Sequence, residues 1–284
     1  MKILLTGGNG QLGRCLQDRF PADWQISVTT SSDLDIGDAA AVERAVLAFQ
    51  PDAIINAAAY TAVDKAESEP ENSARVNSAG PENLARAARL IGARLVHVST
   101  DYVFDGTAQR PYQETDNTSP VCVYGRTKLE GEKRVQELLP DAVILRTAWV
   151  FSEYGSNFVK TMLRLGEQRD ALSIVSDQLG CPTYAGDIAQ AIIVLLQQSA
   201  AGGIYHYCGD QQATWYDFAE QIFIQATQQG RLAKAPQLTA INTEAFPTPA
   251  QRPAYSVLDC SKVQHYGVKL SDWQKALSAV VAES

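Results

Sequence analysis

The sequence lacks several features that would place it in a specialised class of protein. It has no run of Lys or Arg long enough for a nucleic-acid or membrane-binding patch, and its net charge is −8. It has no long apolar stretch, and its N-terminus enters a short apolar strand without the pattern of a signal peptide. We therefore expect a soluble, cytoplasmic protein with neither a nucleic-acid nor a membrane partner.

Cysteine is present but shows no pairing pattern. The five cysteines are odd in number and widely spaced, and no C-x-x-C pair occurs. This usage predicts reduced thiols rather than a disulfide framework or a zinc site. Internal repeats and low-complexity segments are also missing, and 284 residues with 45% hydrophobic side chains can bury a core in one large domain or two intimate ones.

Strands and helices alternate regularly in the first half of the chain. Apolar runs predict strands at residues 2–6, 25–30, 53–56, 94–99 and 142–146, separated by helical patterns that include 39–49 and 71–91. This rhythm predicts a Rossmann-type α/β fold, a parallel sheet with helices on both faces, over residues 1–150. Beyond it the rhythm weakens. We predict that residues 151–284 form mainly a smaller α/β substrate-binding lobe, with elements returning to the Rossmann domain.

A glycine-rich turn follows the first predicted strand. Gly7, Gly10 and Gly13 are spaced G-x-x-G-x-x-G, and a helical pattern of Leu12 and Leu16 comes next. Glycines permit a tight turn and close approach of the backbone, while the helix start offers free N–H groups to a pyrophosphate. The alternative is an ordinary glycine-rich turn, but the strand before it favours dinucleotide binding.

The end of the second predicted strand bears on the choice of cofactor. It reads Thr-Thr-Ser-Ser at 29–32, so no carboxylate stands at its tip to bind a ribose 2′-hydroxyl. This favours NADPH, with NADH also open, and Arg14 is the nearest cation in the sequence. Asp35 and Ile36 could flank an adenine, by a hydrogen bond and an apolar contact; the alternative is an acidic residue at the start of a helix. The small residues at 57–61 would let the backbone lie against a ring or ribose, although simple packing explains them as well.

Tyr124 and Lys128 are candidates for acid/base chemistry. Four residues apart, they share one face of a helix, for which Ser119 and Pro120 provide a plausible start. A phenol has a pKa of about 10, and a nearby lysine cation is expected to lower it. The alternative is a surface tyrosine beside a solvated lysine. Thr100, at the end of a predicted strand, could bind the same substrate oxygen, and Asp101 could add a second polar contact.

Three residues of the second half are candidates for substrate binding. Trp149 could stack on a sugar, while Asn157 and Arg252 could bind a diphosphate or a base. The competing interpretations are a core tryptophan, a helix cap and an arginine at the rim of the site.

Five segments together carry a resemblance to a known family. They are residues 7–13, 56–67, 98–105, 124–128 and 247–253, and they span nearly the whole chain. The sequence resembles the extended short-chain dehydrogenase/reductases, and within them the dTDP-4-dehydrorhamnose reductases. The resemblance implies NAD(P)H-dependent reduction of the 4-keto group of a nucleotide-sugar substrate, dTDP-4-dehydro-L-rhamnose, to dTDP-L-rhamnose for cell-surface polysaccharide.

The resemblance also implies roles for individual residues. The catalytic set would be Thr100, Tyr124 and Lys128. The cofactor site would comprise Gly7, Gly10, Gln11, Leu12, Gly13, Asp35, Ile36, Ala57, Ala58, Ala59, Tyr60, Thr61, Tyr124 and Lys128. The resemblance places Asp101 and Trp149 beside the sugar. With the candidates named above, the expected substrate site comprises Thr100, Asp101, Tyr102, Tyr124, Trp149, Asn157 and Arg252.

One position departs from the resemblance. Some similar proteins carry a glutamate on the first helix that takes part in a magnesium-linked dimer, and Cys15 stands there in this chain. A thiol is a poor ligand for a hard cation, so we expect no magnesium or other metal, and either a homodimer of another form or a monomer.

Two other functions are compatible with the same fold. One is a non-catalytic NADP-binding regulatory subunit, which the loss of the tyrosine or the lysine would favour. The other is a different nucleotide-sugar reductase, epimerase or dehydratase. A dehydratase needs an Asp-Glu pair after the threonine, whereas Tyr102 follows Asp101 here. This residue favours a reductase.

Overall fold

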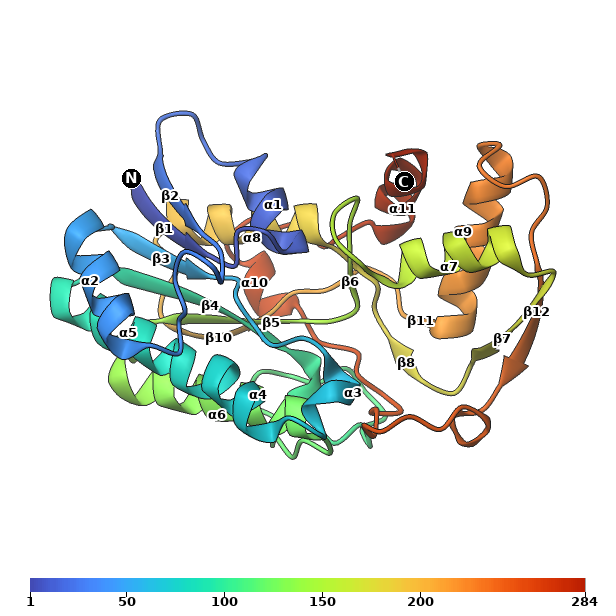
Figure 1. The fold of residues 1–284 in the computed structure, drawn as a ribbon, viewed down its shortest axis with the longest axis horizontal. Coiled ribbons are helices and arrows are strands. Elements are labelled where there is room, and N and C mark those ends of the chain that lie inside the picture. The colour runs from blue at the N-terminus through green and yellow to red at the C-terminus, as the bar shows by residue number, and fades with distance from the viewer. Residues whose placement is uncertain (284) are drawn as a thin grey trace.

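A parallel sheet forms the centre of the larger part of the molecule (Figure 1). The computed structural model describes residues 1–283, and within them the sheet has six strands. Their spatial order is β10 (Gly203–His206), β5 (Val143–Thr147), β4 (Arg94–Thr100), β3 (Ala53–Asn56), β1 (Lys2–Thr6) and β2 (Gln25–Thr29). All neighbours pair in parallel. The strand order reverses beside β1, which has β2 on one side and β3 on the other. A ligand crevice is expected at such a point.

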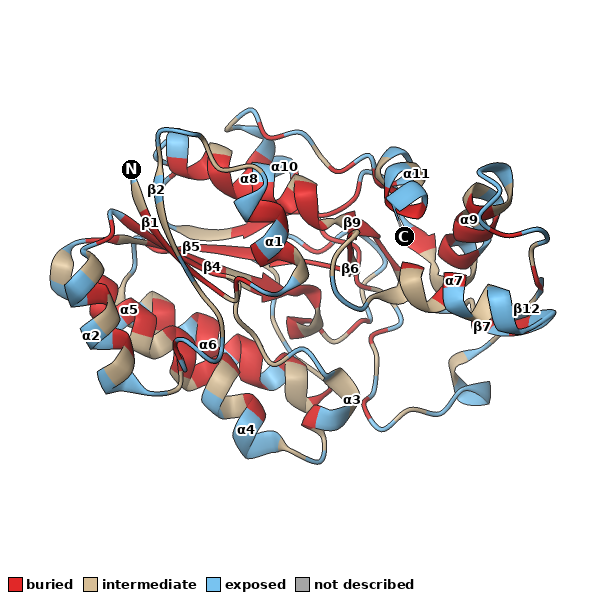
Figure 2. Ribbon diagram, turned by 45° about the horizontal axis from the view of Figure 1, so that its top comes forward, coloured by how far each residue is buried: buried red, intermediate tan, exposed pale blue. Residues whose placement is uncertain are grey.

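Helices cover both faces of this sheet, and its inner strands are buried between them, whereas the edge strand β2 is partly exposed (Figure 2). One face packs against α2 (Ala39–Phe49), α5 (Gly80–Ile91) and α6 (Val123–Leu138). The other packs against α1 (Gln11–Gln17), α8 (Ala185–Gln197) and α10 (Ser261–Gln264). In β3, Ile54 faces the first layer and Ile55 the second, as the alternation of side chains in a strand requires. The predicted Rossmann-type fold is confirmed.

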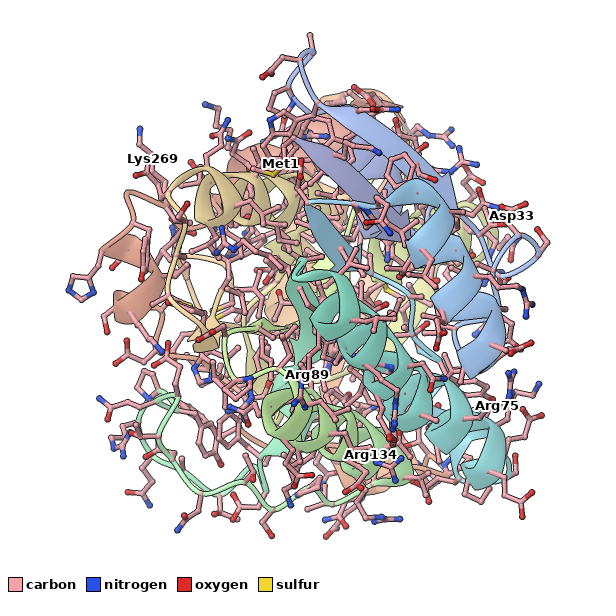
Figure 3. All side chains as sticks on the ribbon, turned by 90° about the vertical axis from the view of Figure 1, so that its left-hand side faces the viewer. Met1, Asp33, Arg75, Arg89, Arg134 and Lys269 are labelled. Atoms are coloured by element: carbon pink, nitrogen blue, oxygen red, sulfur yellow. The ribbon has the colours of Figure 1, made fainter. Side chains whose placement is uncertain are left out.

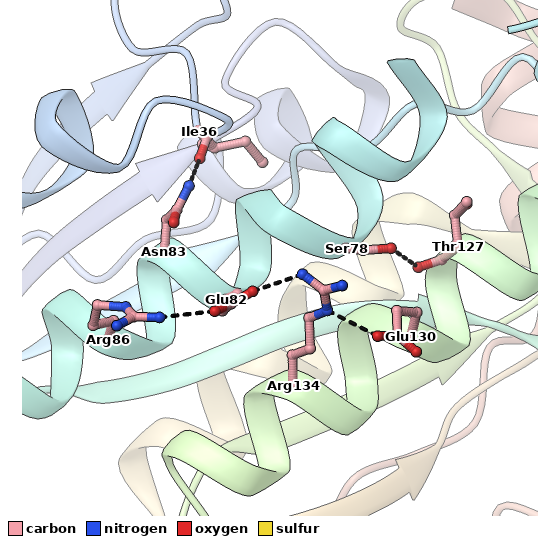
Figure 4. A network of polar contacts seen from close by, with 8 residues as sticks. All are labelled: Ile36, Ser78, Glu82, Asn83, Arg86, Thr127, Glu130 and Arg134. Atoms are coloured by element: carbon pink, nitrogen blue, oxygen red, sulfur yellow. Dashed lines mark hydrogen bonds and ion pairs between the residues drawn. The ribbon is translucent and has the colours of Figure 1, made fainter. Parts of the chain in front are cut away.

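The catalytic candidate helix α6 is fixed to its neighbours by polar contacts. On its outer side, Arg134 bridges Glu82 of α5 and Glu130, at 2.7 and 2.9 Å (Figure 4). On its inner side, Glu132 forms an ion pair of 2.7 Å with Arg146 of β5, and both side chains are almost completely buried. Loss of one partner in a buried pair is strongly destabilising, so the inner contact holds α6 more firmly than the exposed ones.

Two predicted helices differ from the observed ones. The long helix expected at 71–91 is instead α4 (Pro70–Ala74), a π-helical turn at Arg75–Ala79, and α5. The start expected at Ser119 and Pro120 is wrong, because α6 begins at Val123 with Cys122 as its cap. The Ser119 N–H donates to the Val103 carbonyl at 3.0 Å, so this segment packs along the preceding loop. That loop follows a 3-10 turn at Asp101–Val103.

The remaining elements form a smaller lobe beside the sheet (Figure 1). Its core joins α7 (Phe158–Gln168), α9 (Trp215–Gln228) and α11 (Trp273–Glu283) through buried residues such as Phe218 and Trp273. Three two-stranded sheets complete it: β7 (Ala171–Val175) with β12 (Gln237–Ile241), β8 (Leu179–Gly180) with β11 (Ala213–Thr214), and β6 (Val150–Phe151) with β9 (Thr183–Tyr184).

The division of the chain at residue 150 stays a prediction. The segments α8, β10 and α10 belong to the central sheet and its outer layer, although they lie beyond that boundary. Residue 284, the end of the predicted lobe, lies outside the described residues. Across residues 1–283, no helix combines the length and the apolar character that crossing a membrane demands.

Candidate active site

A cavity of about 670 Å³ lies at the carboxyl ends of the central strands. It runs from the glycine turn to Tyr124 and Lys128. Most of the predicted cofactor residues line it: Gly7, Gly10, Gln11, Leu12, Asp35, Ile36, Ala57, Ala58, Ala59, Thr61, Tyr124 and Lys128. Further lining residues that the sequence did not single out include Asn9, Ser31, Leu34, Arg75, Val76, Val98, Ser99, Thr147, Val150, Gly155 and Ser156.

Close packing of the glycine turn shapes one end of this cavity. Gly7 has φ of 75°, and a Cβ on it would lie 2.6 Å from the carbonyl carbon of Ala57. A Cβ on Gly13 would lie 2.2 Å from the Gly7 carbonyl oxygen. Side chains are therefore excluded at both positions, and the ends of β1 and β3 meet through their backbones. Gly7 lines the cavity, whereas Gly13 lies behind the turn and supports it.

Two buried hydroxyl groups in the cavity wall indicate a polar ligand. Ser99 Oγ and Thr147 Oγ1 have no hydrogen-bond partner within residues 1–283, and both residues line the cavity. Buried polar groups in folded proteins are nearly always paired. A ligand with donors and acceptors at this depth would satisfy them. Together with the glycine turn, they make the cavity fit a dinucleotide.

Thr100, Asp101 and Tyr124 form a connected polar group, of which Tyr124 lines the cavity. Thr100 Oγ1 donates to Asp101 Oδ1 at 2.9 Å, and the Tyr124 hydroxyl is hydrogen-bonded to Thr100. Burial raises the pKa of Tyr124, an effect that the bond to Thr100 partly opposes. Burial also raises the pKa of Asp101 to about 7. Tyr124 is therefore protonated at neutral pH, as a proton donor must be.

Lys128 is placed differently from the sequence expectation. Its side chain is almost completely buried, and Nζ donates to the Val98 carbonyl at 2.7 Å. Burial lowers the pKa of Lys128 to about 8, against the opposing effect of Glu132. The expected lowering of the Tyr124 pKa by Lys128 is wrong for this structure, because loss of solvation around the phenol dominates.

Two residues that the sequence did not single out hold the site in place. Asn77, on the π-helical turn, accepts from the Tyr60 N–H at 2.8 Å and donates to the Tyr60 carbonyl at 3.0 Å. It thereby fixes the backbone of 59–61 along the cavity, while the Tyr60 hydroxyl turns away to Glu69. Glu67 accepts from the Val123 N–H at 2.8 Å, at the start of the helix that carries Tyr124.

The substrate-site candidates are not all free to bind a ligand. Asn157 caps α7, and its amide donates to Gln11 Oε1 at 2.9 Å, joining the lobe to the glycine turn. Trp149 has φ of 46°, and its ring stacks on Trp215 with centroids 3.5 Å apart. Tyr102 packs edge to face on Tyr124 at 5.6 Å.

Arg252 is held by an acidic partner. Its guanidinium donates to both carboxylate oxygens of Asp64, at 3.0 and 2.8 Å. The Ala250 N–H, in the same loop as Arg252, also donates to the Asp64 carboxylate. Asp64 belongs to α3 (Val63–Ala66), the same short helix that leads into Glu67. This segment therefore positions both the start of α6 and the loop of Arg252. The binding roles of these candidates stay predictions.

Comparisons with known proteins show to which family the chain belongs. The family model described as the RmlD substrate binding domain matches residues 1–284. A dTDP-4-dehydrorhamnose reductase of Aggregatibacter actinomycetemcomitans is 46% identical, over 99% of this chain and 98% of the relative. The chain belongs to the dTDP-4-dehydrorhamnose reductase family. The family member of Escherichia coli K12 is 42% identical, over 100% of this chain and 98% of its own.

Solved structures with a similar fold include complexes with a nicotinamide cofactor. The dTDP-4-dehydrorhamnose reductase of Bacillus anthracis, solved in complex with NADP, has a TM-score of 0.93 and 37% identity, covering 100% of this chain and 99% of its own. A Thermus thermophilus UDP-glucose 4-epimerase complex with NAD is 22% identical with a TM-score of 0.83, a likeness that shows the fold alone.

Cys15 stands where some similar proteins carry a glutamate, and the structure shows its surroundings. Cys15 lies on the inner face of α1 and is fully buried in the core, so its thiol does not reach the surface. Within residues 1–283, no group of three or more His, Cys, Asp or Glu side chains is arranged to hold a metal ion. The expectation that this chain forms no magnesium-linked dimer stays a prediction.

The ionisation of Lys128 predicts how kcat depends on pH. Since burial lowers the pKa of Lys128 to about 8, its charge is present below that pH and is lost as the pH rises through it. About one pH unit above the pKa, roughly a tenth of the lysines remain charged, so kcat should fall by a comparable factor. The measurement is kcat against pH for the wild type and Lys128→Arg, whose guanidinium stays charged. A similar alkaline fall in the active arginine variant would assign the titration to another group.

Proposed function

We propose that this chain catalyses the NAD(P)H-dependent reduction of dTDP-4-dehydro-L-rhamnose to dTDP-L-rhamnose, for polysaccharide synthesis. The observation that carries the proposal is the juxtaposition of the glycine turn with Tyr124 and Lys128 around one cavity, with Thr100 next to Tyr124. The similarity to named reductases over the full chain supports the substrate. Both reactants are water-soluble anions, which agrees with the expected cytoplasmic location.

The cavity residues suit the two ligands in different regions. We infer that Gly10, Gln11 and Leu12 hold the cofactor pyrophosphate, that Ile36 lies against the adenine, and that Lys128 holds the nicotinamide ribose. When bound, the reduced nicotinamide supplies a hydride. The sugar would enter beside Thr100 and Tyr124, where the buried hydroxyl of Ser99 also lies. Closure of the small lobe over this end would exclude water.

Tyr124 is the proton donor in this mechanism. Reduction of the carbonyl places negative charge on the sugar oxygen, and an alkoxide is much more basic than a phenolate. Tyr124 therefore gives up its proton even with a raised pKa. Thr100 donates to Asp101 in the structure, and its hydroxyl would turn from that carboxylate to donate to the same sugar oxygen. Lys128 would act by holding the nicotinamide ribose rather than on the phenol, whose pKa is raised by burial.

The direct test follows NADPH absorbance with purified protein and enzymatically generated dTDP-4-dehydro-L-rhamnose, with NADH in parallel. We expect loss of absorbance equal to the dTDP-L-rhamnose formed. NADPH that binds but is never oxidised with any nucleotide sugar would instead identify a regulatory subunit. A dehydrated or epimerised sugar without net loss of NADPH would identify a dehydratase or an epimerase.

Arg252→Ala tests the substrate site. A charged hydrogen bond contributes about 1.5–3 kcal/mol, so we expect the KM for the nucleotide sugar to rise roughly tenfold or more, with the dissociation constant of NADPH unchanged. The matched variant Asp64→Asn keeps the arginine but removes the charge that holds it, and should raise the same KM by a smaller factor. If Arg252→Ala weakened the binding of the nucleotide sugar and of NADPH by the same factor, Arg252 would have a structural role.

A further inference from the structure

The adenosine end of the cavity contains a cation that is distant in the sequence. Arg75 comes from the π-helical turn between α4 and α5, yet it lines the same cavity as Thr30 and Ser31, directly after β2. In a Rossmann fold the end of this strand lies beside the ribose of the adenosine, where a nearby arginine can accommodate a 2′-phosphate. Figure 3 shows Arg75 and Asp33, of the loop after β2, along the same edge of the molecule.

The carboxylates near this position leave room for a phosphate. Asp33 Oδ2 accepts from the Thr30 N–H at 2.9 Å and from the Thr30 hydroxyl at 2.6 Å, and Asp33 does not line the cavity. Asp35, which does line it, forms an ion pair with Arg75. The strand end therefore offers the Ser31 hydroxyl and one guanidinium, with a single carboxylate as the partner of that guanidinium.

The ion pair between Arg75 and Asp35 is weak enough for Arg75 to exchange Asp35 for a phosphate. The two side chains are 48% and 49% exposed, and exposed ion pairs contribute about 0–1 kcal/mol. A phosphate carries more charge than a carboxylate, and arginine binds it through two parallel hydrogen bonds. Arg75 can thus turn from Asp35 to a phosphate without leaving a buried charge unpaired. With NADH, which has a hydroxyl at this position, the pair would stay closed.

We propose that Arg75 selects NADPH over NADH, by exchanging its ion pair with Asp35 for the 2′-phosphate of the cofactor. This inference rests on the proposed use of a nicotinamide cofactor. Arg14, the nearest cation in the sequence, is not the selecting residue. Its guanidinium lies over the Tyr154 ring at 5.6 Å from the centroid, and it does not line the cavity.

Equilibrium binding tests the role of Arg75 without any turnover. Fluorescence titrations would compare NADPH and NADH on the wild type, Arg75→Gln and the matched control Arg14→Gln. We expect Arg75→Gln to raise the dissociation constant of NADPH roughly tenfold or more and that of NADH by less than about twofold, because only NADPH loses a charge-assisted contact to its phosphate. Arg14→Gln should change neither. Equal weakening of both cofactors, or no change in either, would overturn the proposal.

Two further measurements use the wild type and therefore do not depend on how a variant folds. On the wild type, 2′,5′-ADP should bind more tightly than 5′-ADP, and added salt should weaken NADPH more than NADH. Asp35→Asn should increase the ratio of NADPH affinity to NADH affinity, because it frees Arg75. A wild type that binds both nucleotides equally would contradict the proposal. Since none of these measurements uses the sugar substrate, their failure is distinguishable from failure of the proposed reaction.

Discussion

Replacement of Tyr124 by phenylalanine is expected to lower kcat by roughly a hundredfold or more, the usual scale for loss of a general acid. The ring stays in place, packed against Tyr102 at 5.6 Å, so NADPH should bind as before. The hydroxyl bonded to Thr100 is removed, and with it the proton for the sugar oxygen. Steady-state kinetics with dTDP-4-dehydro-L-rhamnose and a titration with NADPH would measure the two effects.

Tyr154→Phe is the matched control for this variant. Its hydroxyl donates to Asp18 at 2.8 Å, and Tyr154 is not among the residues that line the cavity. We expect its kcat to stay within about twofold of the wild type, since surface substitutions seldom have larger effects. Unchanged turnover in Tyr124→Phe would remove Tyr124 from the mechanism and leave Thr100 or Asp101 as the proton donor.

The second large effect is expected from Gly125→Ala, next to the catalytic tyrosine. A Cβ at this position would lie 2.2 Å from the Tyr102 carbonyl oxygen, a backbone atom that cannot rotate away. Overpacking of this kind costs about 1–3 kcal/mol, so Tm should fall by several degrees. Relief of the overlap would also move Tyr124 relative to Thr100. A displacement of about 1 Å can lower kcat about a hundredfold.

Gly230→Ala separates these two effects. Gly230 has φ of 71°, but a Cβ there would meet no atom within 4 Å, so this variant adds backbone strain without an overlap. It should lower Tm by a smaller amount and leave kcat unchanged. If Gly125→Ala lost stability but kept the wild-type kcat, the close packing of α6 on the Tyr102 backbone would not set the position of Tyr124.

Local patterns in the sequence were sufficient to predict the central sheet and the helices that cover it. Continuous apolar runs predict strands because both faces of a parallel sheet are buried, and β1, β3 and α2 were predicted with the boundaries that the structure shows. The two-residue strands of the small lobe, such as β6 and β9, were not predicted. They are too short to show a periodicity, and only pairing with distant segments creates them.

Sequence and tertiary structure contributed differently to the site. The glycine turn and the spacing of Tyr124 and Lys128 are local features. The sequence by itself therefore determined that the glycines form a turn and that Tyr124 and Lys128 lie on one face of a helix. The pKa values of Tyr124 and Lys128 follow from burial, which depends on the whole fold, and their directions were decided only there. Likewise, Arg75 reaches the cavity only because a π-helical turn packs beside it, a long-range contact that no local pattern encodes.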